Sequence, residues 1–128
     1  GLNEKAASIL ADVGLADRAR LRAGNLSHGE KRMLELALAL ACEPKLLILD
    51  EPMAGTGPEE TARLIELLLA VKARCPMLLV EHDMDAVFQL ADRISVLVYG
   101  EIIASGTPEE IRADPRVREA YLGEEVPA

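Results

Sequence analysis

Two short apolar runs, each ending in charged side chains, constrain the fold of this chain most. Leu46–Leu49 is followed directly by Asp50 and Glu51, and Met77–Val80 is followed by Glu81-His82-Asp83. Unbroken runs of this length are typical of strands buried on both faces, as in a parallel sheet under helices. A helix-length segment separates the runs, which favours a strand–helix–strand unit with parallel pairing. We therefore predict an α/β fold with parallel strands flanked by helices.

Capping and turn residues divide the rest of the chain into further elements. Ser27, followed three residues later by Glu30, forms a capping box that begins one helix, and Pro58 suits the first turn of another. Tyr99-Gly100 separates two short apolar runs, which predicts a small hairpin. We expect helices over residues 4–13, 27–42, 58–75, 85–91 and from Thr107, a loop over 15–25, hairpin strands over 94–98 and 101–104, and an acidic tail at Glu124-Glu125.

The composition argues against several classes of function. The 128 residues allow one compact domain, and a formal net charge of -8 argues against nucleic-acid binding, which needs a basic face. No apolar run approaches the roughly 18 residues of a membrane span, and no signal peptide is visible. Cys42 and Cys75 lack metal-ligand spacing, which predicts reduced thiols. We expect a soluble cytoplasmic protein.

Asp50, Glu51 and His82 are the first candidate site. They follow the carboxyl ends of two parallel strands, where open α/β sheets place their ligands. Such a trio can serve metal-assisted attack by water, with one carboxylate on Mg²⁺, the other on the water and the imidazole on the developing charge. Acidic residues after a strand also cap turns, and a lone histidine is often only hydrogen-bonded. The buried run before two adjacent carboxylates favours the functional interpretation.

The segment Leu26-Ser27-His28-Gly29-Glu30 is the second candidate site. Its capping box is sufficient to explain it as the start of an ordinary helix. The same helix N-terminus presents bare N–H groups to a phosphate, and Gly29 permits close backbone approach. Both interpretations are compatible with these residues.

Taken together and in order, these segments resemble the ATP-binding cassette (ABC) family. The correspondence is to the signature motif at residues 26–30, Walker B with its adjacent glutamate at 46–51, the D-loop at 53–57 and the switch histidine at His82. The stretches at residues 81–84, 91–94, 99–111 and 120–124 are similar to ATPase subunits of branched-chain amino acid importers. The resemblance covers nearly the whole chain.

The resemblance implies a role for each candidate residue. Asp50 would help hold Mg²⁺ through water, Glu51 would be the general base, and His82 would contact the γ-phosphate of ATP. Ser27 and Gly29 would bind the γ-phosphate of an ATP held by the opposite subunit, because family members sandwich two ATP molecules between two subunits. The implied partners are a second ABC ATPase subunit and transmembrane permease subunits, at the inner face of the plasma membrane.

The sequence departs from the family pattern at His28, Glu30 and Gly57, where Gly, Gln and Asp are common. No lysine follows a glycine, so these residues contain no P-loop. We therefore expect the C-terminal part of an ABC ATPase domain, a partial P-loop NTPase fold. Residues 1–43 would end its helical subdomain, and residues 44–128 would carry Walker B, the D-loop, the switch histidine and the C-terminal region.

Three functional hypotheses follow. The first is an ATPase subunit for amino-acid import, present as a fragment that is inactive alone. The second is a non-catalytic interaction module that supplies Ser27 and Gly29 in trans to another cassette subunit. The third is a stand-alone metal-dependent hydrolase that uses Asp50, Glu51 and His82. A sheet without its P-loop strand also predicts self-association or marginal stability, because an unpaired edge and apolar surface are exposed.

Overall fold

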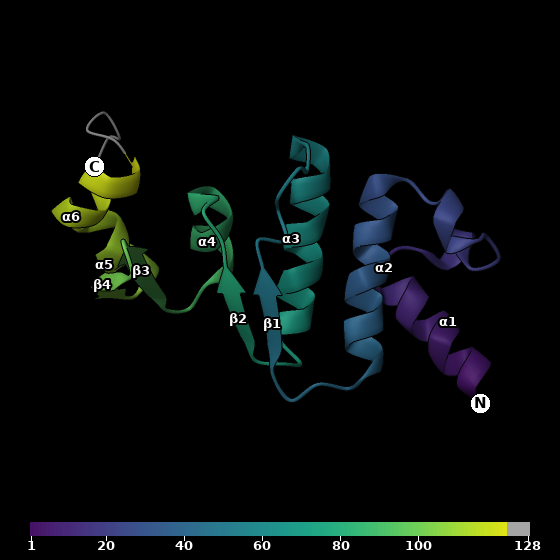
Figure 1. Cartoon of the computed structure of the whole chain (residues 1–128). Coiled ribbons are helices and arrows are strands. Elements are labelled where there is room, and N and C mark those ends of the chain that lie inside the picture. Colours follow the sequence, from purple (N-terminus) through teal and green to yellow (C-terminus); the bar gives the residue numbers. More distant parts are fainter. Residues whose placement is uncertain (123–128) are drawn as a thin grey trace. The chain divides into compact units, whose positions relative to one another are not determined.

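The computed structural model describes residues 1–122 of the chain (Figure 1). The chain forms two compact units, the first spanning Gly1–Val80 and the second beginning at Glu81. Each unit contains both helices and strands, which confirms the α/β class. No helix in the described part of the chain combines the length and the apolar character needed to cross a membrane. The predicted acidic tail, Glu124-Glu125, lies outside the described residues.

Helices α1 (Leu2–Asp12) and α2 (His28–Ala41) form one side of the first unit. The segment between them, predicted as a loop, contains two single 3-10 turns, η1 (Ala16–Arg18) and η2 (Ala23–Asn25). The two helices pack through a small apolar cluster that consists of Val13, Leu15 and Ala37, with Ile9, Leu10, Met33, Leu34, Leu40 and Leu67 around them. This packing fixes α2, whose first turn carries the second candidate site.

Strand β1 (Leu47–Asp50), helix α3 (Pro58–Lys72) and strand β2 (Met77–Val80) form the predicted strand–helix–strand unit. The strands pair in parallel, with a register that runs from Leu47 opposite Met77 to Asp50 opposite Val80. The residues of α3 that are buried follow helical spacing: Leu64, Ile65, Leu68 and Val71. The parallel pairing brings the carboxyl ends of both strands to one edge of the sheet.

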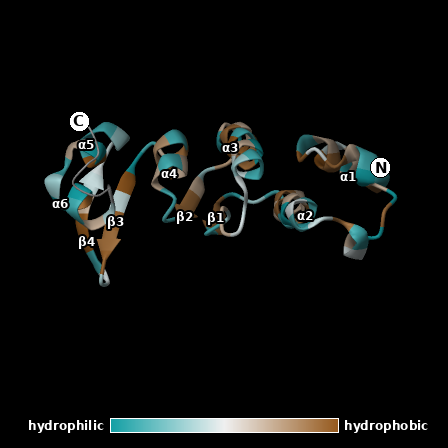
Figure 2. Ribbon diagram, turned by 90° about the horizontal axis from the view of Figure 1, so that it is seen from above, coloured by the Kyte–Doolittle hydropathy of each residue, from teal (hydrophilic) through white to brown (hydrophobic). Residues whose placement is uncertain are grey.

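The prediction that both strands are buried on both faces was wrong for this chain. Ile48 is 62% exposed and Leu78 is 54% exposed, whereas Leu47 is buried. Side chains alternate between the two faces of a strand, and α3 lies along one face only (Figures 1 and 2). The other face is apolar, and Figure 2 colours β2 as hydrophobic along most of its length. An apolar run indicates two apolar faces but does not locate the segments that cover them.

The second unit contains the predicted hairpin of strands β3 (Ile94–Val98) and β4 (Glu101–Gly106). The strands pair antiparallel, with an irregularity between Val96 and Leu97. Tyr99 and Gly100 form the turn with φ angles of 47° and 80°, the left-handed region that tight two-residue hairpins require. The hairpin prediction is confirmed, and β4 extends two residues beyond its predicted end.

Short helices cover this hairpin. They are α4 (Met84–Leu90), α5 (Pro108–Ala113), α6 (Pro115–Val117) and the π-helical turn η3 (Arg118–Leu122). The cap predicted at Thr107 is present, because its side chain accepts a hydrogen bond from the N–H of Glu110. The core of the unit consists of Val87, Ile94, Val96, Ala104, Ile111 and Val117.

Candidate functional site

The capping box predicted at the start of α2 is present. The Ser27 Oγ accepts a hydrogen bond of 3.2 Å from the N–H of Glu30, and a Glu30 carboxylate oxygen accepts one of 2.9 Å from the N–H of Ser27. Glu30 also accepts a hydrogen bond of 2.8 Å from Arg18 Nε. The backbone N–H of Ser27 and then Arg18 stabilise the charged form, which lowers the pKa of Glu30 from 4.5 to about 2.

Gly29 has a packing role that sequence reasoning did not anticipate. A Cβ atom at this position would lie 2.9 Å from the carboxyl group of Glu60, in the first turn of α3. The first turns of α2 and α3 therefore approach each other here. A carboxylate near a helix N-terminus interacts favourably with the helix dipole. The absence of a side chain at Gly29 thus serves this contact, and its predicted role in phosphate binding remains a prediction.

Asp50 and Glu51 stand where β1 ends and the chain turns. The N–H of Glu51 donates to the carbonyl oxygen of Val80 at 2.7 Å, which extends the sheet by one residue. Glu51 has a φ of 49°, in the left-handed region. For a residue other than glycine this conformation costs roughly 1 kcal/mol or more and persists only where the surroundings impose it. Both carboxylates are exposed at this edge.

A pocket of about 300 Å³ in the first unit brings these carboxylates together with a guanidinium group. It is lined by Arg32 and Glu35 of α2, by residues 47–52, and by Leu64 and Leu68 of α3. The lining contains both apolar and charged side chains. The pocket thus combines two acidic groups at a strand end with one basic and one acidic group, Arg32 and Glu35, on the neighbouring helix.

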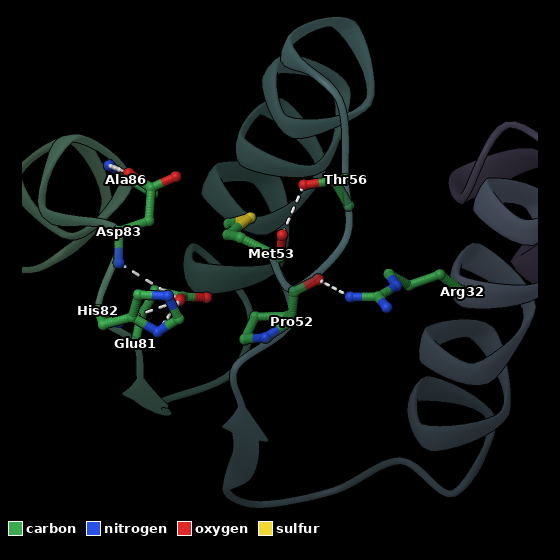
Figure 3. A network of polar contacts seen from close by, with 8 residues as sticks. All are labelled: Arg32, Pro52, Met53, Thr56, Glu81, His82, Asp83 and Ala86. Carbon is green, nitrogen blue, oxygen red and sulfur yellow. Dashed lines mark hydrogen bonds and ion pairs between the residues drawn. The ribbon is translucent and has the colours of Figure 1, made fainter.

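Arg32 holds the turn after β1 (Figure 3). Its Nη1 donates a partly buried hydrogen bond of 2.5 Å to the carbonyl oxygen of Pro52. Further along the turn, Thr56 Oγ1 donates to the carbonyl oxygen of the buried Met53 at 2.7 Å. Sequence reasoning missed Arg32. The available signal was its position four residues before Leu36, which places a charged residue on the inward face of α2.

His82 belongs to the second unit, where it lies beside the carboxylate of Glu81 (Figure 3). A Glu81 carboxylate oxygen accepts hydrogen bonds from the N–H groups of His82 at 3.0 Å and Asp83 at 3.4 Å, and lies 3.7 Å from His82 Nδ1. Asp83 caps α4 by accepting from the N–H of Ala86. The Glu81 side chain is 1% exposed and that of His82 is 71% exposed. Sequence reasoning missed Glu81, and the meeting of His82 with Asp50 and Glu51 stays a prediction.

Asp50 fits the way in which Mg²⁺ is held beside a nucleotide. Within residues 1–122, no group of three or more His, Cys, Asp or Glu side chains is arranged to hold a metal ion by itself. Mg²⁺ at nucleotide sites keeps several waters and takes one or two carboxylates together with phosphate oxygens. A single exposed carboxylate at a strand end is suited to a contact of this kind through water.

Two protein families match separate parts of the chain. Residues 2–54 match the family described as ABC transporter. Residues 101–127 match the family described as Branched-chain amino acid ATP-binding cassette transporter. The first match contains the start of α2 and both strand-end carboxylates, and the second begins at β4.

Individual relatives agree with these families. The chain is 44% identical over 123 residues to the high-affinity branched-chain amino acid transport ATP-binding protein LivG of Escherichia coli K12, covering 94% of this chain and 48% of LivG. It is 43% identical to the corresponding protein BraF of Pseudomonas aeruginosa, with the same coverage. The chain spans about half the length of the curated relatives it matches.

A solved structure shows the same fold. The ATP-binding cassette MJ1267 of an ABC transporter, in its ADP conformation, is similar with a TM-score of 0.83 and 35% identity. The similarity covers 94% of this chain and 50% of that one. The parallel strand pair and the antiparallel hairpin therefore correspond to part of an ABC ATPase domain.

Proposed function

We propose that this chain, which belongs to the ABC transporter ATP-binding proteins, forms the part of an ATP-hydrolysing subunit that carries the catalytic carboxylate and the signature helix. The observation that carries the proposal is the end of β1. There Glu51 directly follows Asp50, adopts a left-handed backbone conformation and donates its N–H to the carbonyl oxygen of Val80. Backbone strain of this kind is concentrated at functional sites.

Each residue has a role in this proposal. Glu51 accepts the proton of the water that attacks the terminal phosphate, and Asp50 orients the waters around the metal. Mg²⁺, when bound, supplies positive charge to the phosphate oxygens. His82 contacts the γ-phosphate. Ser27 and Gly29 contact the phosphate of an ATP held by the opposite subunit. The Ser27 hydroxyl, which accepts a hydrogen bond from the N–H of Glu30, can still donate one to a phosphate oxygen.

The substrate and the partners are proposed from the relatives. Similarity to LivG and BraF favours branched-chain amino acid import. The subunit would pair with a second ATPase subunit and act on permease subunits at the inner face of the plasma membrane. We assign the lysine-bearing phosphate loop to polypeptide outside these 128 residues, since no lysine in the sequence follows a glycine.

The substitution Glu51→Gln in the full-length subunit that contains this chain tests the proposal. We expect ATP binding to be retained and hydrolysis to fall by roughly 100-fold to 10,000-fold, because the amide keeps the shape of the side chain but cannot accept the proton. Turnover of ATP and equilibrium binding of a fluorescent ATP analogue are the measurements. Glu66→Gln, at an exposed position of α3, is the matched control.

Different outcomes separate the competing functions. Undiminished hydrolysis by Glu51→Gln would remove Glu51 from the role of general base. A full-length subunit that binds another cassette subunit but never hydrolyses ATP would favour the interaction module. Mg²⁺-dependent turnover by the 128-residue chain alone would favour the metal-dependent hydrolase.

A further inference from the structure

Arg32 connects two parts of the first unit that the mechanism uses separately. Its Nη1 donates to the carbonyl oxygen of Pro52 across 20 residues of chain, from α2 to the turn after β1. Figure 3 shows the guanidinium group pointing from α2 toward this carbonyl group. The same side chain lines the pocket that holds Asp50 and Glu51. Arg32 thus lines the same pocket as the proposed general base, and the proposed function gives Arg32 no role.

Hydrogen bonds at Glu51 and at the following Pro52 hold this part of the backbone, and Arg32 supplies one of them. The Glu51 N–H donates to Val80, and the Glu51 carbonyl oxygen accepts from the N–H of Ala54 at 3.1 Å. Arg32 fixes the following carbonyl group, that of Pro52. A residue with a φ of 49° leaves this conformation when its surroundings relax. Loss of the Arg32 contact would therefore release the C-terminal side of the Glu51 turn.

Arg32 is also close to the start of α2. The helix begins at His28, so that Arg32 is about one turn from the end that carries Ser27 and Gly29. A short helix moves as a stiff body, and a displacement of its first turn displaces Arg32 as well. The contact between Arg32 and Pro52 would pass such a displacement to Glu51.

We propose that Arg32 is a positioning residue that holds the Glu51 turn in the geometry for hydrolysis and makes this geometry depend on the position of the α2 N-terminus. The proposal rests on the proposed function, in which Glu51 is the general base. A guanidinium group suits this task, because it presents several N–H donors in a fixed plane. A lysine could donate to the same carbonyl group but with less geometric control.

The test compares Arg32→Gln, Arg32→Lys and Lys31→Gln in the full-length subunit that contains this chain. We expect Arg32→Gln to lower kcat roughly 10-fold to 100-fold while KM for ATP stays within about twofold, because the turn is misplaced but the nucleotide still binds. Arg32→Lys should recover part of kcat. Lys31→Gln should behave as the unaltered protein, because Lys31 is exposed on the same helix.

The melting temperature and amide hydrogen exchange distinguish positioning from general destabilisation. We expect the amide of Ala54 to exchange faster in Arg32→Lys, while the amide of Ala86 in the second unit keeps its rate. This measurement decides the matter even if Arg32→Gln does not fold. An unchanged rate at Ala54 would overturn the proposal, as would a loss of kcat that follows the melting temperature and is not recovered by lysine.

The failure of this proposal is distinguishable from the failure of the proposed function. Normal kcat in Arg32→Gln together with an inactive Glu51→Gln would overturn the positioning role and leave Glu51 as the general base. Full turnover in Glu51→Gln would overturn both.

Discussion

Glu30 is a residue whose charge is stabilised by its neighbours at the start of α2. The N–H of Ser27 and the side chain of Arg18 hold its pKa at about 2, below the usual 4.5. A carboxyl group with a lowered pKa contributes stability that is present above pH 4.5 and is lost as the pH falls toward 2. Part of the acid sensitivity of the first unit should therefore come from this one side chain.

The substitution Glu30→Gln tests this expectation. Glutamine can still accept the hydrogen bond from Ser27 but carries no charge, so that the melting temperature of the variant should fall less between about pH 5 and pH 2. Melting curves of both proteins across this range are the measurement, and Glu66→Gln controls for the loss of one negative charge. Parallel pH profiles for Glu30→Gln and the unaltered chain would contradict the assignment.

Among the elements, α3 has the weaker start. Gly57 is its N-cap and supplies no side-chain hydrogen bond, in contrast to Ser27 at α2. The φ of Gly57 is -77°, an ordinary value for any residue, and a Cβ there would meet nothing within 4 Å. The structure therefore leaves room for a capping side chain at this position.

We expect Gly57→Asp to stabilise the chain by a few tenths of a kcal/mol, because aspartate can accept hydrogen bonds from the free N–H groups of the first turn. Urea unfolding at neutral pH is the measurement. Gly57→Ala is the control, since it adds a Cβ atom without an acceptor. Destabilisation by aspartate but not by alanine would indicate that repulsion from Glu59 and Glu60 outweighs the cap.

The elements that the sequence predicted well are those determined by local chemistry. The capping box at Ser27, the proline at the start of α3 and the turn at Tyr99-Gly100 act within a few residues, and each was present. The contact of Arg32 with Pro52 and that of Gly29 with Glu60 join distant segments, and no local pattern identifies the partner of either residue. The same difference explains the error over strand burial. The apolar runs and the adjacent helix α3 can be recognised in the local sequence, whereas the segment that would cover the second face of the strands cannot.

At the scale of the whole molecule, the first unit presents an apolar sheet face. Ile48, Leu78 and Val80 are all about half exposed or more on the two strands, and within the described residues β1 and β2 pair only with each other. Exposed strand edges and apolar patches favour association between molecules. The isolated chain should therefore self-associate or be only marginally stable.

Light scattering and thermal melting of the 128-residue chain test this expectation. We expect particles larger than a monomer, or a low and shallow melting transition, and Ile48→Lys should shift the population toward monomers. Leu38→Lys is the matched control, because Leu38 is equally exposed but lies on α2. A monomer with a cooperative transition at high temperature would count against the apolar face as a source of association.

The left-handed backbone at Glu51 also has an evolutionary consequence. A glycine would adopt this conformation without strain, so that the carboxylate is kept there at a cost in stability. Under the proposed role of Glu51 as general base, selection for ATP turnover opposes this cost. In lineages where turnover is no longer under selection, drift should replace the glutamate at this position with glycine or asparagine. The residue found at this position would then distinguish relatives that hydrolyse ATP from relatives that have kept only the fold.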